Sequence, residues 1–165
     1  MAKSLPVGFY AGLLIALIIG LFCNWSWQPE RQVSRHTDGL LRAVEHKNWS
    51  RVNDLVAGDY TDQWGDDRKL MLARLREAFR YVRDVKIRFA DRIITTEHRR
   101  GIWRAKITID ADNGEVGPMV EQRVNLLTTP FELEWRRVSA KPWDWKLFHV
   151  SNSELELGPS STEPE

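Results

Sequence analysis

The stretch HKNWSRVNDLVAGDYTDQWGDD, residues 46–67, separates a helical part of the chain from a part with strand periodicity. Within it, Ser50 is a good N-cap for a short helix over 50–57, and Gly58 is a typical helix stop. The residues that follow, DYTDQWGDD, are polar and turn-forming, and they include Tyr60 and Trp64. The stretch therefore predicts a short helix followed by a turn, after which the architecture changes.

Helical periodicity is found on both sides of this stretch. Upstream, residues 34–48 place Leu40, Leu41 and Val44 at helical spacing. Downstream, residues 67–82 carry one apolar stripe, and arginine and lysine line the remaining surface. The stripe consists of Leu70, Leu72, Leu75, Ala78, Phe79 and Val82. Together with 50–57, these segments predict three helices.

From Val85 onward the period changes from 3.6 to 2. Apolar and polar residues alternate over 85–89, 103–109, 120–126 and 131–135, and Asp112-Asn113-Gly114 is a turn signal. The last segment, 143–151, is apolar on both faces, which is typical of a central strand. No helix is expected between these strands, so the sheet is predicted to be antiparallel. We therefore predict an α+β domain with three helices on one face of a curved sheet of about five strands. Its core should contain Trp103, Trp135 and Trp145.

The N-terminal run LPVGFYAGLLIALIIGLFC, Leu5–Cys23, contains no charged residue. Its length is close to the roughly 20 residues that a helix needs to cross a bilayer. Lys3 precedes the run, and Trp25 and Trp27 follow it at the depth of the headgroup layer. We expect a transmembrane helix over 5–23, with an N-terminal tail over 1–4 and a tether over 24–34. Lys3, Trp25 and Trp27 are the expected membrane-interface anchors.

Two other interpretations of this run remain open. A cleaved signal peptide usually has a shorter apolar region and a small-x-small cleavage site, which is missing before Cys23. A lipid-modified Cys23 would require small residues at the positions of Leu21 and Phe22. For the retained helix, Lys3 favours an N-terminus inside the cell, although Arg31 and Arg35 oppose it. We expect a single-pass protein of the cell inner membrane with a periplasmic domain.

Composition excludes several classes of protein. The net charge is +1 and the basic face lacks interleaved aromatic residues, so we expect no nucleic-acid partner. Cys23 is the only cysteine, which excludes a disulfide or a cysteine-bound metal in the rest of the chain. Basic residues dominate from Arg68 to Lys106, and acidic residues dominate from Asp110 to Glu134. The last segment, residues 158–165 (GPSSTEPE), has the composition of a disordered tail.

The order of elements resembles the nuclear transport factor 2-like (NTF2-like) superfamily, including its SnoaL-like branch. The resemblance covers residues 35–157 and rests on residues 46–67 and on the closing segment PWDWKLFHVSNSEL. It implies a cone-shaped α+β fold in which a curved sheet and a long helix enclose a cavity. The superfamily includes ketosteroid isomerases, epoxide hydrolases, polyketide cyclases and non-catalytic binding and assembly domains. The fold therefore does not decide between catalysis and binding.

Alternation gives no acidic residue on the face that would line such a cavity. The polar candidates on that face are Gln122 and His149, and Tyr60, Asp62 and Tyr81 could close its mouth. Asp62 and His149 could form an acid–base unit, or Asp62 could cap a turn while His149 is a hydrogen-bonded core residue. The four histidines share no ligand spacing, so we expect no metal site and no cofactor.

Alternation also gives one outward sheet face with four basic residues: Lys86, Arg88, Arg104 and Lys106. These residues could pair with acids on neighbouring strands. Alternatively, they could contact anionic lipid headgroups or an acidic partner protein.

Two functions are compatible with these features. The first is a membrane-anchored, non-enzymatic binding or assembly subunit of a bacterial-type membrane protein complex. Its layout resembles that of the anchored assembly subunits of secretion machines. The second is a small-molecule carrier, or an isomerase- or hydrolase-type enzyme, that uses the cavity with His149, Asp62 and Tyr60. The acid-free interior and the apolar run favour the first.

Overall fold

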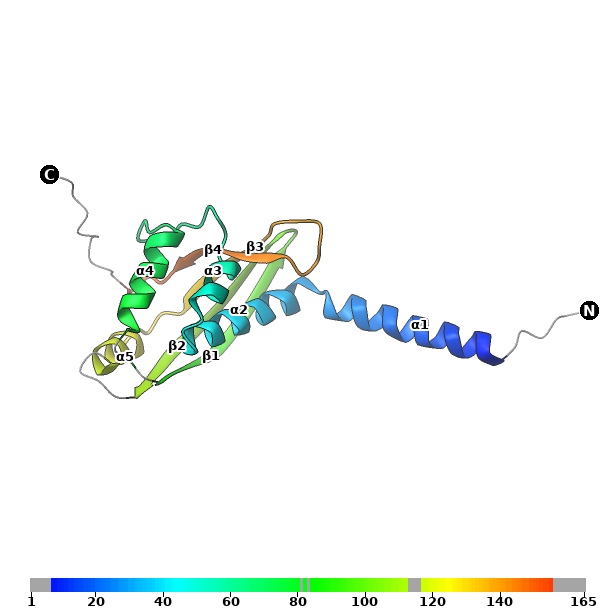
Figure 1. Cartoon of the computed structure of the whole chain (residues 1–165), viewed down its shortest axis with the longest axis horizontal. Coiled ribbons are helices and arrows are strands. Elements are labelled where there is room, and N and C mark those ends of the chain that lie inside the picture. The colour runs from blue at the N-terminus through cyan, green and yellow to red at the C-terminus, as the bar shows by residue number, and fades with distance from the viewer. Residues whose placement is uncertain (1–6, 81, 83, 113–116, 156–165) are drawn as a thin grey trace, which may run out of the picture.

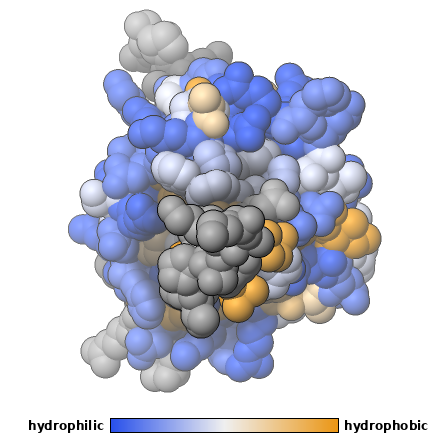
Figure 2. Space-filling model, turned by 90° about the vertical axis from the view of Figure 1, so that its right-hand side faces the viewer, coloured by the Kyte–Doolittle hydropathy of each residue, from blue (hydrophilic) through white to orange (hydrophobic). Residues whose placement is uncertain are grey.

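The computed structural model describes residues 7–80, 82, 84–112 and 117–155. A long helix, α1 (Val7–Ser26), projects from an α+β domain (Figure 1). Seen from the α1 end, the surface of the domain is largely hydrophilic (Figure 2). The predicted tails, 1–4 with Lys3 and 158–165, lie outside the described residues, as does Tyr81. From residue 7 onward, the predicted anchor coincides with α1.

Among the described residues, no helix combines the length and the apolar character that a membrane span requires.

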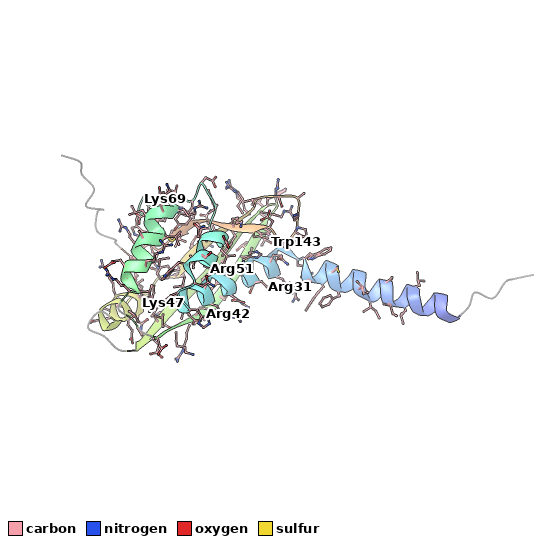
Figure 3. The ribbon with its side chains drawn as sticks, viewed as in Figure 1. Arg31, Arg42, Lys47, Arg51, Lys69 and Trp143 are labelled. Carbon is pink, nitrogen blue, oxygen red and sulfur yellow. The ribbon has the colours of Figure 1, made fainter. Side chains whose placement is uncertain are left out.

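The predicted tether over 24–34 is helical at both ends. α1 continues to Ser26, and α2 (Pro29–Glu45) begins two residues later with a proline in its first turn, a position where proline's missing N–H costs nothing. Gln32 Nε2 donates to the Ser26 carbonyl oxygen at 2.8 Å, and Arg35 Nη1 donates to Ser26 Oγ at 2.8 Å. These contacts join α2 directly to the end of α1. Arg31, in the first turn of α2, and Trp143 both lie at the α1 end of the domain (Figure 3).

Two further helices precede the sheet. α3 (Trp49–Leu55) is capped by the side chain of Asn48, which accepts from Arg51 N at 3.0 Å, so Ser50 is not the cap. α4 (Arg68–Ala78) is capped by Asp67, which accepts from Leu70 N at 2.8 Å. The predicted trio of helices is present, although α4 ends four residues before the predicted boundary.

The sheet has four antiparallel strands in chain order: β1 (Asp84–Glu97), β2 (Arg100–Asp112), β3 (Phe131–Arg137) and β4 (Trp145–Ser151). α2 packs against β1 and β2 from one face. Trp103, Trp135 and Trp145 are at most 1% exposed. The predicted α+β class and the predicted tryptophan core are confirmed.

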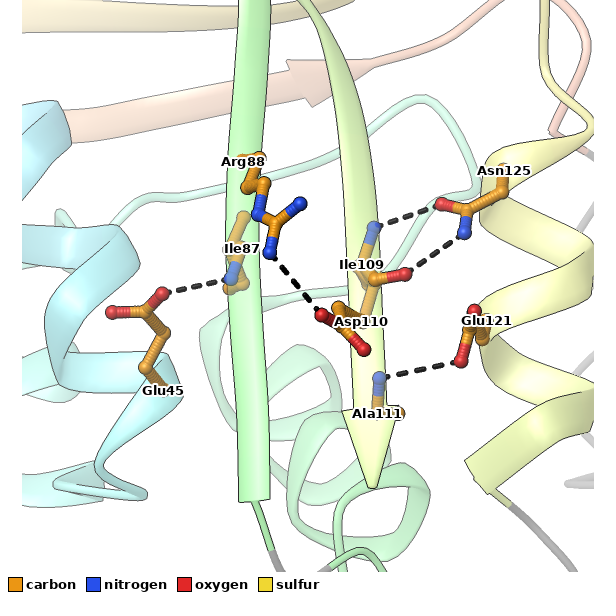
Figure 4. A network of polar contacts seen from close by, with 8 residues as sticks. All are labelled: Glu45, Ile87, Arg88, Ile109, Asp110, Ala111, Glu121 and Asn125. Carbon is orange, nitrogen blue, oxygen red and sulfur yellow. Dashed lines mark hydrogen bonds and ion pairs between the residues drawn. The ribbon is translucent and has the colours of Figure 1, made fainter. Parts of the chain in front are cut away.

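The predicted strand over 120–126 is wrong, because α5 (Gly117–Asn125) contains these residues up to Asn125. β3 pairs with β2 only along residues 100–105, which leaves the rest of that β2 edge without a strand. Asn125 fills this gap: its amide side chain pairs with the N–H and the carbonyl of Ile109, each at 2.8 Å (Figure 4). Glu121 accepts from Ala111 N at 3.3 Å in the same way.

β4 is an edge strand of the sheet, contrary to the prediction that it is central. Residues 56–63 run along its outer side and supply backbone hydrogen bonds. Ala57 N donates to Leu147 O at 2.8 Å, and Gln63 N donates to Val150 O at 3.1 Å. This segment acts as an irregular neighbouring strand and satisfies backbone groups on the outer edge of β4.

α2 approaches the sheet closely at Gly101. A Cβ atom at this position would lie 2.4 Å from Val33 Cγ2, well inside van der Waals contact. Val33 is completely buried, and Trp145 packs against the same spot. A glycine in β2 therefore sets how closely the N-terminal half of α2 packs on the sheet.

We expect Gly101→Ala to lower the free energy of unfolding by about 1–3 kcal/mol, because a buried valine in a helix has little rotamer freedom with which to yield. Gly39→Ala is the matched control: it lies in α2 with no atom within 4 Å of an added Cβ. It should raise stability by up to about 1 kcal/mol through helix propensity. Urea unfolding, monitored by tryptophan fluorescence, measures the free energy of unfolding of both variants. Equal values for the two variants would contradict the close approach.

Candidate binding cavity

A cavity of about 430 Å³ lies between the helices and the sheet. Its sheet side is formed by Ile87, Ile107, Ile109, Phe131, Leu133, Leu147 and Val150. Its helix side is formed by Leu40, Leu41, Val44, Val52, Met71, Leu75, Ala78, Phe79 and Val124. The lining is almost wholly apolar, so the cavity suits an apolar occupant of small-molecule size.

The polar residues of the lining come mainly from the turn between α3 and α4. Tyr60, Asp62, Trp64 and Asp66 belong to this turn, and Arg74 of α4 faces it. Trp64 Nε1 donates to the carbonyl of Leu155 at 2.7 Å, which holds the described C-terminal end of the chain against the same region.

Asp62 is the organising residue of this turn. Its Oδ1 accepts from Trp64 N at 3.0 Å and from Asp66 N at 2.9 Å, and its Oδ2 accepts from the Tyr60 hydroxyl at 3.3 Å. Burial, followed by the negative charge of Asp62, raises the pKa of Tyr60. Both carboxylate oxygens of Asp62 are therefore occupied in holding the turn.

Asp66 is a buried acid, only 2% exposed. Arg74 Nε lies 2.8 Å from Asp66 Oδ2; the two form an ion pair by distance, without the alignment of a hydrogen bond. Burial raises the pKa of Asp66, the nearby Asp62 charge raises it further, and Arg74 partly offsets both. Sequence analysis missed this pair, because Asp66 lies in a polar turn and Arg74 lies among several other basic residues of its helix.

His149 is not part of the cavity lining. Phe148 is an extra residue in β4, since Glu134 pairs with His149 while Trp135 pairs with Leu147. Such a bulge reverses the alternation beyond it, so Val150 lines the cavity in place of His149. His149 Nδ1 donates to the backbone carbonyl of Thr61. The structure thus brings Tyr60 and Asp62 together, but it does not join His149 to them.

The remaining predicted sites also have defined positions. Gln122 is exposed on α5 and does not face the cavity. Within the described part of the chain, no group of histidine, cysteine, aspartate and glutamate residues has the arrangement of a metal site. Trp25 and Trp27 are 47% and 45% exposed, and the Arg31 guanidinium lies 3.5 Å from the centre of the Trp25 ring.

The four basic sheet residues lie in β1 and β2, and two of them are paired. Arg104 forms a two-pronged ion pair with Glu132, at 2.6 and 3.1 Å. Arg88 lies 3.3 Å from Asp110. Lys86 and Lys106 form no ion pair with the described residues. The face therefore has mixed charge, and Lys106 is close enough to Glu154 to contribute to the lowered pKa of that acid.

The chain was compared with protein families, curated proteins and solved structures. No family model and no curated protein sequence matches it. Among solved structures, an NTF2-like protein of unknown function from Pseudomonas putida matches 73% of this chain and 82% of its own, with 9% identity and a TM-score of 0.54. An NTF2-like protein from Cytophaga hutchinsonii matches 72% of this chain and 91% of its own, with 14% identity and a TM-score of 0.50.

The domain has the NTF2-like fold. Bdellovibrio bacteriovorus Bd1075 also matches 73% of this chain, with 8% identity and a TM-score of 0.56, but this chain spans only 40% of that protein. At such identities the likeness concerns the fold alone. It confirms that the chain contains an NTF2-like domain and leaves the activity of that domain open.

The raised pKa of Asp66 predicts an unusual pH dependence of stability. A buried acid whose folded-state pKa lies above its ordinary value of 3.8 stabilises the fold below that pH. This contribution is lost as the pH rises through the folded-state value. We therefore expect the unfolding free energy of the parent, minus that of Asp66→Asn, to fall as the pH is raised from about 3.8.

Asp59→Asn is the control, because Asp59 has a shift of the opposite sign. The Arg136 guanidinium, at 2.7 and 2.8 Å from its oxygens, lowers the pKa of Asp59. The unfolding free energy of the parent, minus that of Asp59→Asn, should rise with pH up to 3.8 and then level off. Two parallel pH profiles of urea unfolding would be inconsistent with a buried, destabilised Asp66.

Proposed function

We propose that this chain is a non-enzymatic binding or assembly subunit that α1 anchors in a membrane, as part of a bacterial-type membrane complex. The observation that carries this proposal is the apolar surface of α1. Its large residues from Leu13 to Phe22 are each more than half exposed. Burial of such a surface in lipid is strongly favourable, whereas its exposure to water is costly.

The anchor would comprise the run from Leu5 to Cys23, in a single pass, with the domain on the periplasmic side. Positive charge at Lys3 favours this orientation. Trp25 and Trp27 would lie in the headgroup layer.

The state of the polar residues supports binding rather than catalysis. Asp62 has both carboxylate oxygens engaged in its turn, and His149 donates to the Thr61 backbone. General acid–base catalysis needs a group that can reach a substrate proton. The Asp62–His149 pair that an enzyme of this fold could have used is not assembled.

The outer face of the sheet is the proposed partner contact. Lys86 and Lys106 provide charges without ion-pair partners among the described residues, and Arg88 and Arg104 provide charges that a stronger acidic partner could recruit. We expect purification of the full chain from its native membranes in mild detergent to recover a membrane protein in fixed ratio. Changing Lys86, Arg88, Arg104 and Lys106 to glutamine should reduce that recovery, while folding is kept because exposed ion pairs contribute little to stability.

A matched variant carries Arg42→Gln, Arg51→Gln, Lys69→Gln and Arg76→Gln, which removes four exposed charges from α2, α3 and α4. Figure 3 labels the first three of these residues. The matched variant should recover the partner as well as the parent does. The proposal fails if the parent recovers no protein in fixed ratio. The docking face is wrong if the sheet variant and the helix variant recover equal amounts.

A second candidate function, binding of an apolar small molecule, is supported by the cavity itself. Ala78 lines the cavity from α4, whereas Ala73 on the same helix is exposed. A phenylalanine at position 78 would occupy part of the 430 Å³ volume, and one at position 73 would not.

We expect the fluorescent probe N-phenyl-1-naphthylamine to bind the parent and the Ala73→Phe variant equally, and to bind Ala78→Phe more weakly. Partition of the probe into detergent is common to all three samples and cancels in the comparison. Equal binding by Ala78→Phe would mean that the cavity does not take the probe.

A further inference from the structure

The end of the domain next to α1 contains a cluster of exposed aromatic residues from two distant parts of the sequence. Trp27 lies between α1 and α2, and Trp143 lies in the loop 138–144 that joins β3 to β4. Their ring centres are 6.1 Å apart. Trp143 is 51% exposed, and Val138 at the start of the loop is 43% exposed. The fold thus holds the β3–β4 loop beside the end of α1.

The junction between α1 and the domain is short and well bonded. Ser26, the last residue of α1, accepts from Gln32 and from Arg35, and Gln32 is only 4% exposed. Trp27 N also donates to Cys23 O at 3.0 Å, which continues the helical hydrogen bonding. A long flexible tether would let the domain move away from the bilayer. This junction keeps the loop at the level of Trp27.

Positive charge accompanies the aromatic cluster. Arg99, at the tip of the β1–β2 hairpin, donates to the Ser139 carbonyl of the loop at 2.9 Å. Lys141 is exposed in the same loop, and Arg31 and Arg35 are on the first turns of α2. The acids in this region are Glu30 on α2, Asp144 in the loop and Glu97 at the same hairpin tip as Arg99. The α1 end of the domain is therefore a mixture of indole rings and basic side chains, the composition that lipid headgroup layers attract.

We propose that the β3–β4 loop is a second membrane contact, in which Trp143 enters the headgroup layer and Lys141 and Arg99 bind anionic phosphate. This inference rests on the proposed anchoring by α1. Each headgroup layer is roughly 5–8 Å thick, from the difference between total and hydrocarbon thickness. With Trp27 in that layer, a ring 6.1 Å away is within about one layer thickness of it. The contact would fix the orientation of the domain, and hence the direction in which the cavity and the outer sheet face point.

Spin labels at three positions test the anchor and the loop separately. The full chain, with Cys23→Ser, is reconstituted in vesicles of phosphatidylcholine and phosphatidylglycerol. Leu17→Cys reports on α1, Ala140→Cys reports on the loop, and Gln122→Cys reports on α5 at the opposite end of the domain (Figure 1). All three residues are exposed. The measured quantity is the ratio of label accessibility to oxygen over that to a water-soluble nickel chelate.

The label at 17 should show the high ratio of the hydrocarbon core, and the label at 122 the low ratio of water. The accessibility ratio at position 140 should be severalfold higher than the ratio at position 122. Trp143→Ala should lower the ratio at position 140 toward the value at position 122. A water-like ratio at position 17 would overturn the anchor and the loop contact together. A lipid-like ratio at position 17 together with a water-like ratio at position 140 would overturn the loop contact alone.

Discussion

The contact between Gly101 and Val33 determines how the rest of the molecule is arranged. It brings the N-terminal half of α2 onto β2 so closely that no side chain fits between them. At the other end of α2, Glu45 accepts from Ile87 N at 2.7 Å, which ties that end to β1 (Figure 4). The helix therefore crosses the β1–β2 hairpin in one direction only. This fixes which end of the domain α1 leaves from.

The same arrangement separates two functional regions. Where α2 packs tightly, near Gly101, the interior is filled by Val33 and the three tryptophans. Toward its C-terminal half, residues such as Leu40 and Val44 line the cavity instead. The cavity thus lies toward the end of the domain remote from α1, while the aromatic and basic cluster lies at the end next to α1. A ligand or protein partner could use one region while lipid contacts the other.

Much of the fold could be predicted because simple periodicity encodes it. Trp103, Trp135 and Trp145 occupy alternate positions of predicted strands, and all three are core residues. The alternation over 120–126 was misleading, because a short segment with apolar residues at every second position can also form about two turns of helix. What decides between them is Asn125 pairing with the β2 edge, a tertiary contact that no local pattern contains.

The candidate site was less predictable for a related reason. One extra residue at Phe148 is enough to reverse the side on which His149 lies, and the sequence carries no sign of that bulge. Asp62 could be recognised as a turn residue from its neighbours, and this is its role. The partnership of Trp27 with Trp143 links positions more than a hundred residues apart, so only the folded chain reveals it.

Alkaline carbonate extraction of membranes that contain the full chain tests most directly whether α1 is an anchor. Leu14→Lys with Ile18→Lys puts two charges into the apolar surface of α1, each costing roughly 2.5–3.5 kcal/mol in a bilayer. Ile93→Lys with Leu126→Lys makes the same change at two exposed apolar residues of the domain. The parent and the domain variant should stay in the pellet, and the α1 variant should be released. Release of the parent, or retention of the α1 variant to the same extent, would contradict anchoring by α1.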